Sequence, residues 1–372
     1  MSFASFTPAE VLVYPKRENY VKPDNAYRGC PTVAVTKKGR VFVGWYTGGY
    51  CEPHMDNFNV LVMSDDSGRT FTPPVLVIPS NKERLFHALD IQLWISPDGR
   101  LFVFWMQNDV WKTGLADCFE QTVLPNKGGY RFGDYTHNLW CVTCDDPDAE
   151  TLVFSSPRKI DTGFLRCKPT VLPDGKWLLL NYDQLHDRYG YSVSTDGLAT
   201  MPQHFYGAKK YGGMFDRGGE WFDEGMAYVT QNGDVRALFR DNHGKIVESV
   251  SHDGALTFED ARQTDITSPS SRHFVARTPS GRVLLVHNDH EKDRTNMTVK
   301  LSDDDGKTWK YSVCLDTRAY ISYPDADFYG DKIYLVYDRD RMGAREVLFA
   351  CFTEEDIING AAIVFKNIEQ PE

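Results

Sequence analysis

The chain has 372 residues, of which 41% are hydrophobic and 13% aromatic, and it carries a formal net charge of −11. A chain of this length can bury a large core without a disulfide or a metal, and no apolar run approaches the roughly 18–20 residues of a membrane span. The acidic balance excludes nucleic acid as a partner, because binding it depends on neutralising phosphates. A local cluster of arginines can still bind an anionic sugar.

The first ten residues, MSFASFTPAE, have neither the basic nor the apolar region of a secretory signal. We therefore expect a cytoplasmic protein, or a secreted one if a signal has been removed. The eight cysteines are scattered and mostly lie in apolar segments. Cys141 and Cys144 have CxxC spacing, but no second pair completes a zinc site. The sequence predicts buried thiols, no metal and no cofactor.

A turn that ends in glycine and leads into an apolar strand occurs six times along the chain. The copies are Gly39 with Val41–Trp45, Gly99 with Leu101–Trp105, Gly175 with Trp177–Leu180, Gly233 with Val235–Phe239, Gly281 with Val283–His287, and Gly330 with Lys332–Tyr337. Such turns before β-branched and aromatic residues are a hairpin signal. Successive glycines are about 50 to 75 residues apart, which fits a four-stranded propeller blade. The repeat predicts an all-β, six-bladed β-propeller, with residues 1–372 as one domain.

A second motif, S-x-D-x-G-x-T-[W/F], follows four of the strands. It is near perfect at Ser64–Phe71 and Ser302–Trp309, has alanine for glycine in Ser251–Phe258, and keeps only Ser, Asp and Thr in Ser194–Met201. The aspartate can accept backbone N–H groups within the turn, and the glycine permits positive φ. This motif, the Asp-box, is structural. We expect its copies at hairpins on the face opposite the functional pocket.

From about Tyr27 to about Tyr337 the chain resembles the sialidase superfamily, whose propellers carry Asp-boxes. In that family three arginines bind the substrate carboxylate, a tyrosine attacks the anomeric carbon, a glutamate activates the tyrosine, and an aspartate on a mobile loop is the acid/base. The resemblance implies a six-bladed propeller of the sialidase type. Such propellers also include lyases and binding modules, so the site has to be argued separately.

Five residues match the family's site in blade order. The segment Tyr27–Pro31 resembles the motif of the first arginine, with one extra residue before the proline. The resemblance implies Arg28, Arg240 and Arg294 as carboxylate-binding residues, Tyr323 as the nucleophile and Glu224 as its base. A buried carboxylate needs bidentate partners, which arginine supplies and lysine does not. An anomeric centre with its own carboxylate would repel an anionic nucleophile, so a neutral phenol with a neighbouring base is suited to the attack.

The acid/base loop departs from the family pattern, because Pro53 stands at the position of the aspartate. Glu52, His54 and Asp56 all lie within a small alignment shift, and residue type favours Asp56. The Gly48-Gly49 pair just upstream suits a loop that reaches over the pocket. Further candidates for the pocket rim are Arg272, His273, His87 and Asp90.

The sequence favours a retaining exo-glycosidase that removes a terminal acidic sugar, with sialic acid first, from an oligosaccharide. The first alternative is a lyase acting beside a uronic acid, such as one that releases rhamnose from a glucuronate. The same arginines would then lower the pKa of the C5 proton, and His54 or Tyr323 would abstract it. The second alternative is a non-catalytic glycan-binding propeller, which needs arginines but neither Glu224 nor Tyr323.

Overall fold

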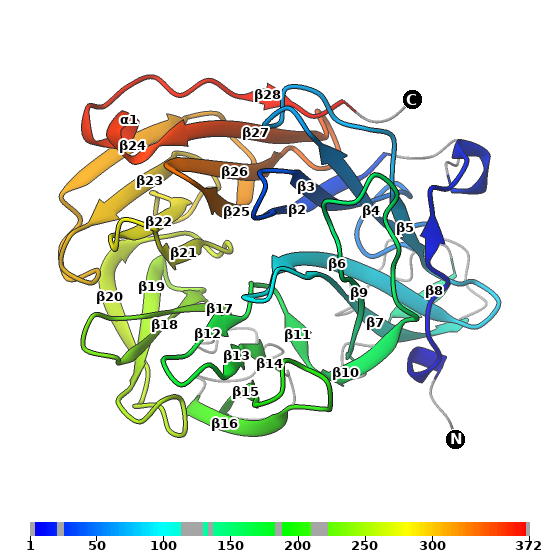
Figure 1. The fold of residues 1–372 in the computed structure, drawn as a ribbon, viewed down its shortest axis with the longest axis horizontal. Helices are drawn as coiled ribbons and strands as arrows, with labels where there is room; N and C mark the ends of the chain where they lie inside the picture. The colour runs from blue at the N-terminus through cyan, green and yellow to red at the C-terminus, as the bar shows by residue number, and fades with distance from the viewer. Residues whose placement is uncertain are drawn as a thin grey trace.

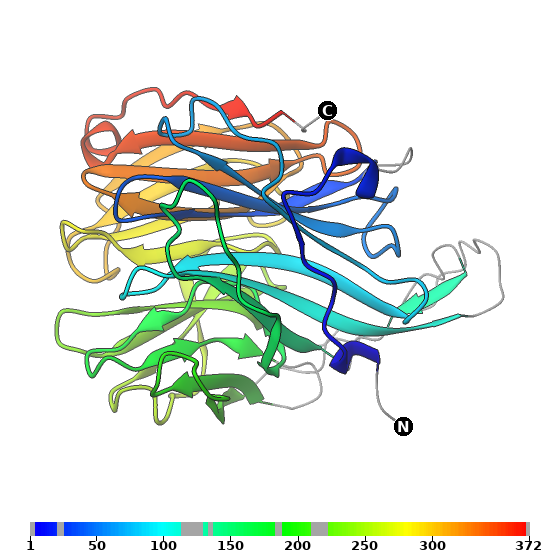
Figure 2. The same cartoon turned by 45° about the vertical axis from the view of Figure 1, so that its right-hand side comes forward.

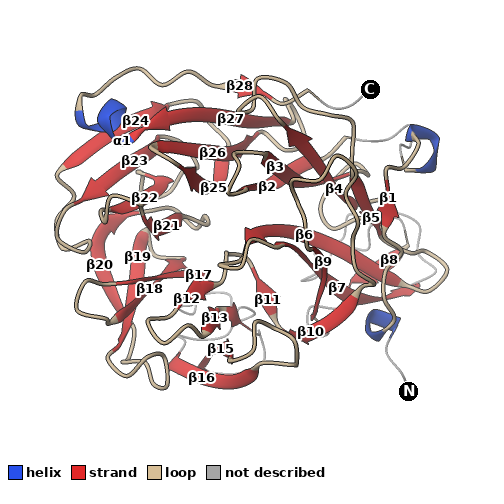
Figure 3. Ribbon diagram, viewed as in Figure 1, coloured by secondary structure: helices blue, strands red, loops and turns tan. Residues whose placement is uncertain are grey.

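The computed structural model describes residues 4–20, 26–112, 129–132, 137–182, 188–209 and 222–369. Its strands form the six blades of a propeller around a central axis, with hardly any helix (Figures 1 and 3). Within those ranges, helix is limited to two 3-10 turns, Ala4–Phe6 and Arg17–Asn19, and to α1 (Glu354–Ile358). No described helix is long and apolar enough to cross a membrane.

The first three blades are antiparallel sheets, and their strands lie side by side in the order of the chain. Blade 1 consists of β2 (Arg28–Val35), β3 (Val41–Thr47), β4 (Phe58–Ser64) and β5 (Leu76–Pro79), with β1 (Leu12–Val13) outside β5. Blade 2 consists of β6 (Phe86–Ile95), β7 (Leu101–Lys112), β9 (Asn138–Cys144) and β10 (Arg158–Thr162), and β8 (Tyr130–Phe132) pairs with β7. Blade 3 consists of β12 (Thr170–Val171), β13 (Trp177–Leu179), β15 (Arg188–Ser194) and β16 (Gln203–Lys209), extended by the pair β11 (Phe164–Leu165) and β14 (Asn181–Tyr182). Figure 2 shows β6 and β7 reaching beyond the neighbouring blades.

The last three blades repeat this order without extra strands. Blade 4 consists of β17 (Phe222–Val229), β18 (Val235–Asp241), β19 (Lys245–Ser251) and β20 (Arg262–Thr267). Blade 5 consists of β21 (Phe274–Arg277), β22 (Val283–Asn288), β23 (Met297–Ser302) and β24 (Tyr311–Asp316). Blade 6 consists of β25 (Ile321–Tyr329), β26 (Lys332–Arg339), β27 (Glu346–Thr353) and β28 (Lys366–Asn367).

The six turn glycines of the sequence repeat join the first and second strands of the six blades. Their φ angles are between +60° and +93°, a region that glycine reaches without a steric penalty. In blade 1, Gly39 N–H donates to the Thr36 carbonyl at 3.0 Å, which closes the hairpin. Each predicted strand begins where the second strand of a blade begins. The six-bladed, all-β prediction is confirmed.

Each Asp-box is closed by its own residues. In blade 1, Asp66 accepts hydrogen bonds from Thr70 N–H at 2.8 Å and from the Thr70 hydroxyl at 2.7 Å. Ser64 Oγ donates to Asp66 at 2.7 Å and accepts from Gly68 N–H at 2.8 Å. The boxes follow β4, β15, β19 and β23, so they lie at the edge opposite the starts of the inner strands. The predicted hairpin position of the Asp-boxes agrees with the structure.

A buried polar network crosses the axis and joins blades 1, 3 and 6. Asp325 Oδ2 on β25 accepts hydrogen bonds from Lys168 Nζ at 2.6 Å and from the Thr32 hydroxyl on β2 at 2.7 Å. These bonds close the propeller where β2 lies beside β25 (Figure 1). On the Asp-box side, a cavity of about 620 Å³ is lined by Lys168, Trp94 and Met226 among others. On the other side, the inner strands begin, and a charged cluster fills the axis.

Candidate active site

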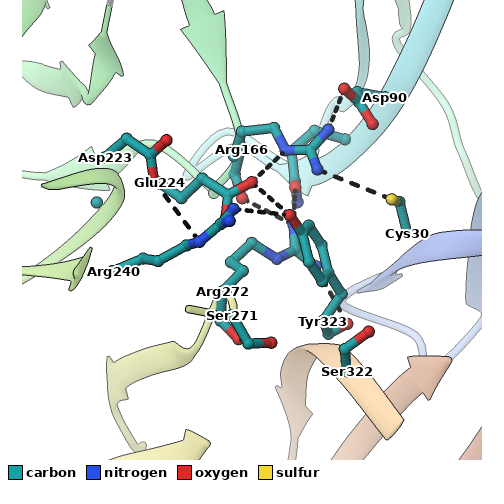
Figure 4. A network of polar contacts seen from close by, with 12 residues as sticks. Cys30, Asp90, Arg166, Asp223, Glu224, Arg240, Ser271, Arg272, Ser322 and Tyr323 are labelled. Carbon is teal, nitrogen blue, oxygen red and sulfur yellow. Dashed lines mark hydrogen bonds and ion pairs between the residues drawn. The ribbon is translucent and has the colours of Figure 1, made fainter. Parts of the chain in front are cut away.

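Four inner strands carry a β-bulge at the same level. Their register shifts lie between Gly29 and Thr32, Leu89 and Gln92, Asp223 and Met226, and Ser322 and Asp325. Within these bulges, Cys30, Asp90, Glu224 and Tyr323 have φ angles of +53°, +55°, +45° and +56°. A bulge re-aims a side chain, and positive φ at a residue other than glycine costs about 1–3 kcal/mol. Four blades therefore turn four side chains toward one another (Figure 4).

Tyr323 and Glu224 form the centre of this cluster. The Tyr323 hydroxyl donates to Glu224 Oε1 at 2.7 Å. Arg240 Nη1 lies 2.7 Å from Glu224 Oε2 and 3.1 Å from the phenol oxygen. Glu224 and Tyr323 are both buried, and an ionised carboxylate withdrawn from water needs a cation or hydrogen-bond donors to stabilise it. Arg240 supplies both and holds the two groups together.

Arg166, which follows β11 in blade 3, joins the cluster from the opposite side. Its guanidinium forms an ion pair with Asp90, and its Nε lies 3.3 Å from Glu224 Oε1 (Figure 4). Its Nη2 lies 3.7 Å from Cys30 Sγ. Arg166 is buried with these partners. One guanidinium thus links the bulge residues of blades 1, 2 and 4.

Four guanidinium groups surround the Tyr323 ring. Their carbons lie 4.2 Å from the ring centroid for Arg341, 5.0 Å for Arg166, 5.2 Å for Arg272 and 5.3 Å for Arg294. Cations over an aromatic face are attracted by its quadrupole. With Arg240 at its hydroxyl, Tyr323 is enclosed by positive charge.

Two of these arginines differ in how their charge is balanced. Arg341 pairs with Asp338 at 3.0 Å and with Glu52 at 3.2 Å. Arg294 donates to the Ser270 carbonyl at 2.9 Å and to Ser322 Oγ at 3.5 Å, and no carboxylate of the described residues pairs with it. Arg294 therefore offers a positive charge to a ligand.

The cluster sets the protonation of its members. Burial and the charge of Glu224 raise the pKa of Tyr323, against the opposing effect of Arg240, Arg166 and Arg294. Burial would raise the pKa of Glu224, but Arg240 and Arg166 outweigh it and hold that pKa below its usual range. Burial raises the pKa of Asp90 to about 6 despite Arg166. A neutral phenol therefore donates to an ionised carboxylate, as a nucleophile and its base require.

Among the three acid/base candidates, Glu52 contacts this cluster. Its Oε2 accepts a hydrogen bond from the Tyr27 hydroxyl at 2.6 Å and lies 3.2 Å from Arg341 Nη1. The side chain keeps 28% of its surface exposed, so it can meet both a ligand and water.

His54 and Asp56, on the same loop, have other partners. The His54 ring lies 4.6 Å from the Tyr50 ring, and Asp56 pairs with Lys82 at 2.8 Å. Between them, Met55 packs into a small apolar cluster with Val110 and Phe132. This packing fixes the loop so that its described contacts with the Tyr323 cluster are made by Glu52.

Three further predicted residues, Arg28, His87 and Arg272, contact neighbours around the cluster. Arg28 is buried, with its guanidinium carbon 4.5 Å from the centroid of the Trp45 ring. Its backbone N–H donates to the Arg341 carbonyl at 2.9 Å, but its described side-chain contacts do not include the cluster. His87 Nε2 lies 2.8 Å from the Tyr46 hydroxyl inside the core. Arg272 donates to the carbonyls of Arg166 at 2.7 Å and Pro31 at 3.1 Å, so it ties the inner strands together beneath Tyr323.

Sequence reasoning missed Arg166, Arg341 and Cys30. A Cβ on Gly29 would stand 2.7 Å from Arg341 Cδ. The side chain of Arg341, from blade 6, therefore packs directly against the Gly29 backbone, next to Arg28. The blade repeat was the available signal for Arg166 and Cys30, since both stand at the level where blades 4 and 6 place Glu224 and Tyr323. Arg341 lies on a hairpin loop, where no repeat marks it.

One group in the described part of the chain could offer three metal ligands. The donor atoms of Cys30, Glu52 and Asp90 lie within 4.8 Å of one another. Arg166 already pairs with Asp90, and Arg341 with Glu52. The positive charges of Arg166 and Arg341 would repel a metal ion at this place.

Comparisons with known proteins give a family and a fold. A family model described as a BNR repeat-like domain matches residues 133–335, more than half of the chain. No curated protein sequence matches the chain.

Several solved structures are similar in shape. The intramolecular trans-sialidase from Ruminococcus gnavus, solved with oseltamivir carboxylate, has a TM-score of 0.68 at 15% identity and covers 91% of this chain and 98% of its own. A leech intramolecular trans-sialidase, solved with 2,7-anhydro-Neu5Ac, has a TM-score of 0.68 at 14% identity and covers 91% and 70%. A protein of unknown function from Dyadobacter fermentans DSM 18053 has a TM-score of 0.67 at 16% identity and covers 92% and 97%. At these identities the likeness shows the fold and no more.

Proposed function

The chain belongs to the family of BNR repeat-like domains, and on that premise we propose that it is a retaining exo-glycosidase that removes a terminal acidic sugar from a glycan. The observation that carries this proposal is the hydrogen bond of 2.7 Å from the Tyr323 hydroxyl to Glu224 inside a ring of guanidinium groups. A glycan-binding module needs the cations but has no use for a phenol paired with a carboxylate.

Tyr323 is the nucleophile in this proposal. Its raised pKa keeps the phenol protonated at rest. As the phenol oxygen attacks the anomeric carbon, its proton passes to Glu224 Oε1 along the existing hydrogen bond. Arg240 bonds to both partners, so it stabilises the pair while the proton moves. The product of this step is a glycosyl-tyrosine.

Glu52 is the acid/base in this proposal. Its partly exposed side chain beside Arg341 supports the role. It gives its proton to the leaving oxygen as the glycosidic bond breaks. In the second step it takes a proton from water, which attacks the anomeric carbon, and the phenol recovers its proton from Glu224. The sugar leaves with its anomeric configuration retained, because it has been inverted twice.

Arg294, Arg240 and Arg341 bind the sugar carboxylate in this proposal. Arg294 has no carboxylate partner among the described residues. Arg240 pairs with Glu224, and Arg341 pairs with Glu52. Charge-assisted, bidentate bonds are the strong ones for a carboxylate. Arg341 takes the part that the sequence assigned to Arg28.

The test is product analysis on 3′-sialyllactose and on a rhamnosyl-glucuronate oligosaccharide. We expect free acidic sugar of retained configuration and one labelled oxygen from labelled water. An unsaturated uronate that absorbs in the ultraviolet, with no labelled oxygen, would replace this proposal with the lyase alternative and make Tyr323 its base. Binding of either glycan without turnover would replace it with the binding-module alternative.

A further inference from the structure

A cavity of about 620 Å³ lies on the Asp-box side of the axis, away from the Tyr323 cluster. It is formed among the ends of β6, β17, β21 and β25, four of the inner strands that surround the axis (Figure 1). Along β25, Tyr323 belongs to the cluster, Asp325 belongs to the buried network, and Asp327 lines the cavity. The cavity is therefore a second recess, separated from the proposed active site by that network.

The walls of this cavity are largely apolar. Four blades contribute large apolar side chains to it, namely Trp94, Met226, Phe274 and Phe328. The rings of Phe274 and Phe328 have their centroids 6.4 Å apart, so blades 5 and 6 present two neighbouring aromatic rings. Cavities of about 300–1,000 Å³ with apolar and aromatic walls are typical of small-molecule sites. The size and the lining therefore suit a small organic molecule.

Asp327 is the acidic residue among the described residues that line this cavity. Its Oδ2 accepts a hydrogen bond from Val35 N–H at 2.8 Å, and its Oδ1 accepts one from Phe328 N–H at 2.9 Å. In the described part of the chain, no lysine, arginine or histidine forms an ion pair with it. A carboxylate has about four acceptor sites, so Asp327 can accept further hydrogen bonds from a ligand.

The protonation of Asp327 shows what kind of ligand would stabilise it. Burial raises the pKa of Asp327 to about 6, against the opposing charge of Lys168. The carboxylate is therefore largely ionised at neutral pH, although it has no ion-pair partner among the described residues. An ionised carboxylate withdrawn from water is stabilised by a cation at its side.

The cations of the same lining already have partners. Lys168 Nζ donates to Asp325 and to two backbone carbonyls, which uses all three donors of an ammonium group. Arg277 pairs with Asp305 and donates to two further carbonyls. An anionic ligand would meet cations that are already paired, whereas a cationic ligand would meet the carboxylate of Asp327.

We propose that this cavity binds a small organic ammonium ion, which pairs with Asp327 and packs its apolar body against Trp94 and Phe328. Aromatic faces beside the carboxylate also attract a cation. The site requires neither an acidic sugar nor the chemistry of Tyr323, so it does not depend on the proposed function. It adds a second ligand, opposite in charge to the first, at the other end of the axis.

Three probes that share a phenyl ring and differ in charge test this site: 2-phenylethylamine, 2-phenylethanol and phenylacetate. Saturation-transfer NMR detects weak binding, and a titration gives the Kd of each probe. We expect the amine to bind about ten- to hundredfold more tightly than the alcohol, because a hydrogen bond to a charged partner is stronger than a neutral one. Phenylacetate should bind least, because its charge repels that of Asp327.

Four variants locate the binding. Asp327→Asn should weaken binding of the amine to the level of the alcohol and leave binding of the alcohol unchanged. Asp331→Asn removes the same charge from an exposed position in the turn after β25, and it should keep the wild-type affinities. Ala276→Trp places a large ring in the cavity lining and should abolish binding of both probes. Tyr323→Phe should leave all affinities unchanged.

The outcomes that would overturn the proposal are distinct. One is an equal Kd for the amine and the alcohol on the wild type, and another is an amine Kd that Asp327→Asn leaves unchanged. Displacement of the amine by 3′-sialyllactose would place it in the Tyr323 cluster and also overturn the proposal. If Asp327→Asn does not fold, the three probes on the wild type and on Ala276→Trp decide the question. A protein that is inactive on every glycan but binds the amine through Asp327 would refute the proposed function and leave this site in place.

Discussion

The two ends of this propeller use the same strained backbone for opposite purposes. At the Asp-box end, Ser67, Leu198, Ala255 and Asp305 have positive φ, and the turn is satisfied by neighbours, as where Thr70 bonds to Asp66 four residues away. At the other end, Tyr323 bonds to Glu224, 99 residues away. A turn that satisfies itself locally stabilises its own hairpin. A bulge that points a charged group at distant blades creates a site whose groups depend on one another.

The largest expected effect separates these two uses of strain. Tyr323→Phe should lower turnover at least about a thousandfold, because the nucleophile is lost, while the ring still packs against its arginines. The matched variant at the other end is Ser64→Ala, which should lose about 1 kcal/mol of unfolding free energy and keep full activity. Steady-state kinetics and denaturant unfolding measure both. An active Tyr323→Phe protein would remove Tyr323 from the chemistry.

The second prediction concerns the dependence of the buried charges on one another. Arg166→Met should cost about 3–5 kcal/mol of unfolding free energy, because Asp90 is left buried without its cation. Lys176→Ala breaks the exposed pair with Asp174 at 2.7 Å and should cost about 0–1 kcal/mol. Urea unfolding compares them, and adding Asp90→Asn to Arg166→Met should recover part of the loss. Equal losses of unfolding free energy in Arg166→Met and Lys176→Ala would contradict the expected difference between the buried and the exposed ion pair.

The third prediction concerns pH. Burial lowers the pKa of His273 to about 4 and that of His287 to about 3. The pKa of a histidine in the unfolded chain is about 6.5, and below that pH the unfolded chain binds protons that the folded chain does not. The unfolding free energy therefore has its whole histidine contribution above about pH 6.5 and falls as the pH drops toward 4. Each histidine contributes a slope of about 1.4 kcal/mol per pH unit. Asp90 and Asp327 oppose it below about pH 6, because burial raises the pKa of each to about 6 and the folded chain keeps their protons.

The Asp-box carboxylates respond in a lower range. Burial raises the pKa of Asp253, but its bonds to Thr257 and Ser251 outweigh this and lower the pKa to about 2. Their contribution is therefore present above pH 4 and lost only as the pH falls toward 2. Unfolding free energies of the wild type and of His273→Gln, measured from pH 7 to pH 4.5, isolate the contribution of this histidine. The difference between the two proteins should change with pH below about 6.5, and a difference that stays constant over this range would contradict the assignment.

The smallest expected effect is a gain in stability. Ala255 occupies the glycine position of its Asp-box with a φ of +65°. Ala255→Gly should relieve that strain and raise the unfolding free energy by about 0.5–1 kcal/mol, with no change in activity. Thermal unfolding measures it. A loss of stability would mean that the buried methyl group of Ala255 contributes more than the strain costs.

The same contrast explains what the sequence could predict. The glycine turns and Asp-boxes are local, so their residues stand side by side in the chain and the blades could be counted. Glu224, Arg240 and Tyr323 could be placed by their order relative to those blades, and the structure brings them together. Arg28 does not join them, because the bulge in β2 turns Cys30 to the axis. Arg341 reaches the cluster from a loop, through contacts that only the folded chain defines.

The choice within the acid/base loop shows the same limit. Residue type favoured Asp56, but the loop's position is set by Met55, which packs with Val110 of blade 2. That contact spans two blades and has no signature in the loop's own sequence. The structure brings Glu52, rather than Asp56, into contact with Arg341.

The network of Lys168, Asp325 and Thr32 across the axis has a consequence for how a ligand enters and leaves the site. In the described part of the chain, these bonds close the axis beneath the Tyr323 cluster. On the proposed function, a glycan would therefore enter the site by its terminus and leave by the same side, and would not pass through the ring.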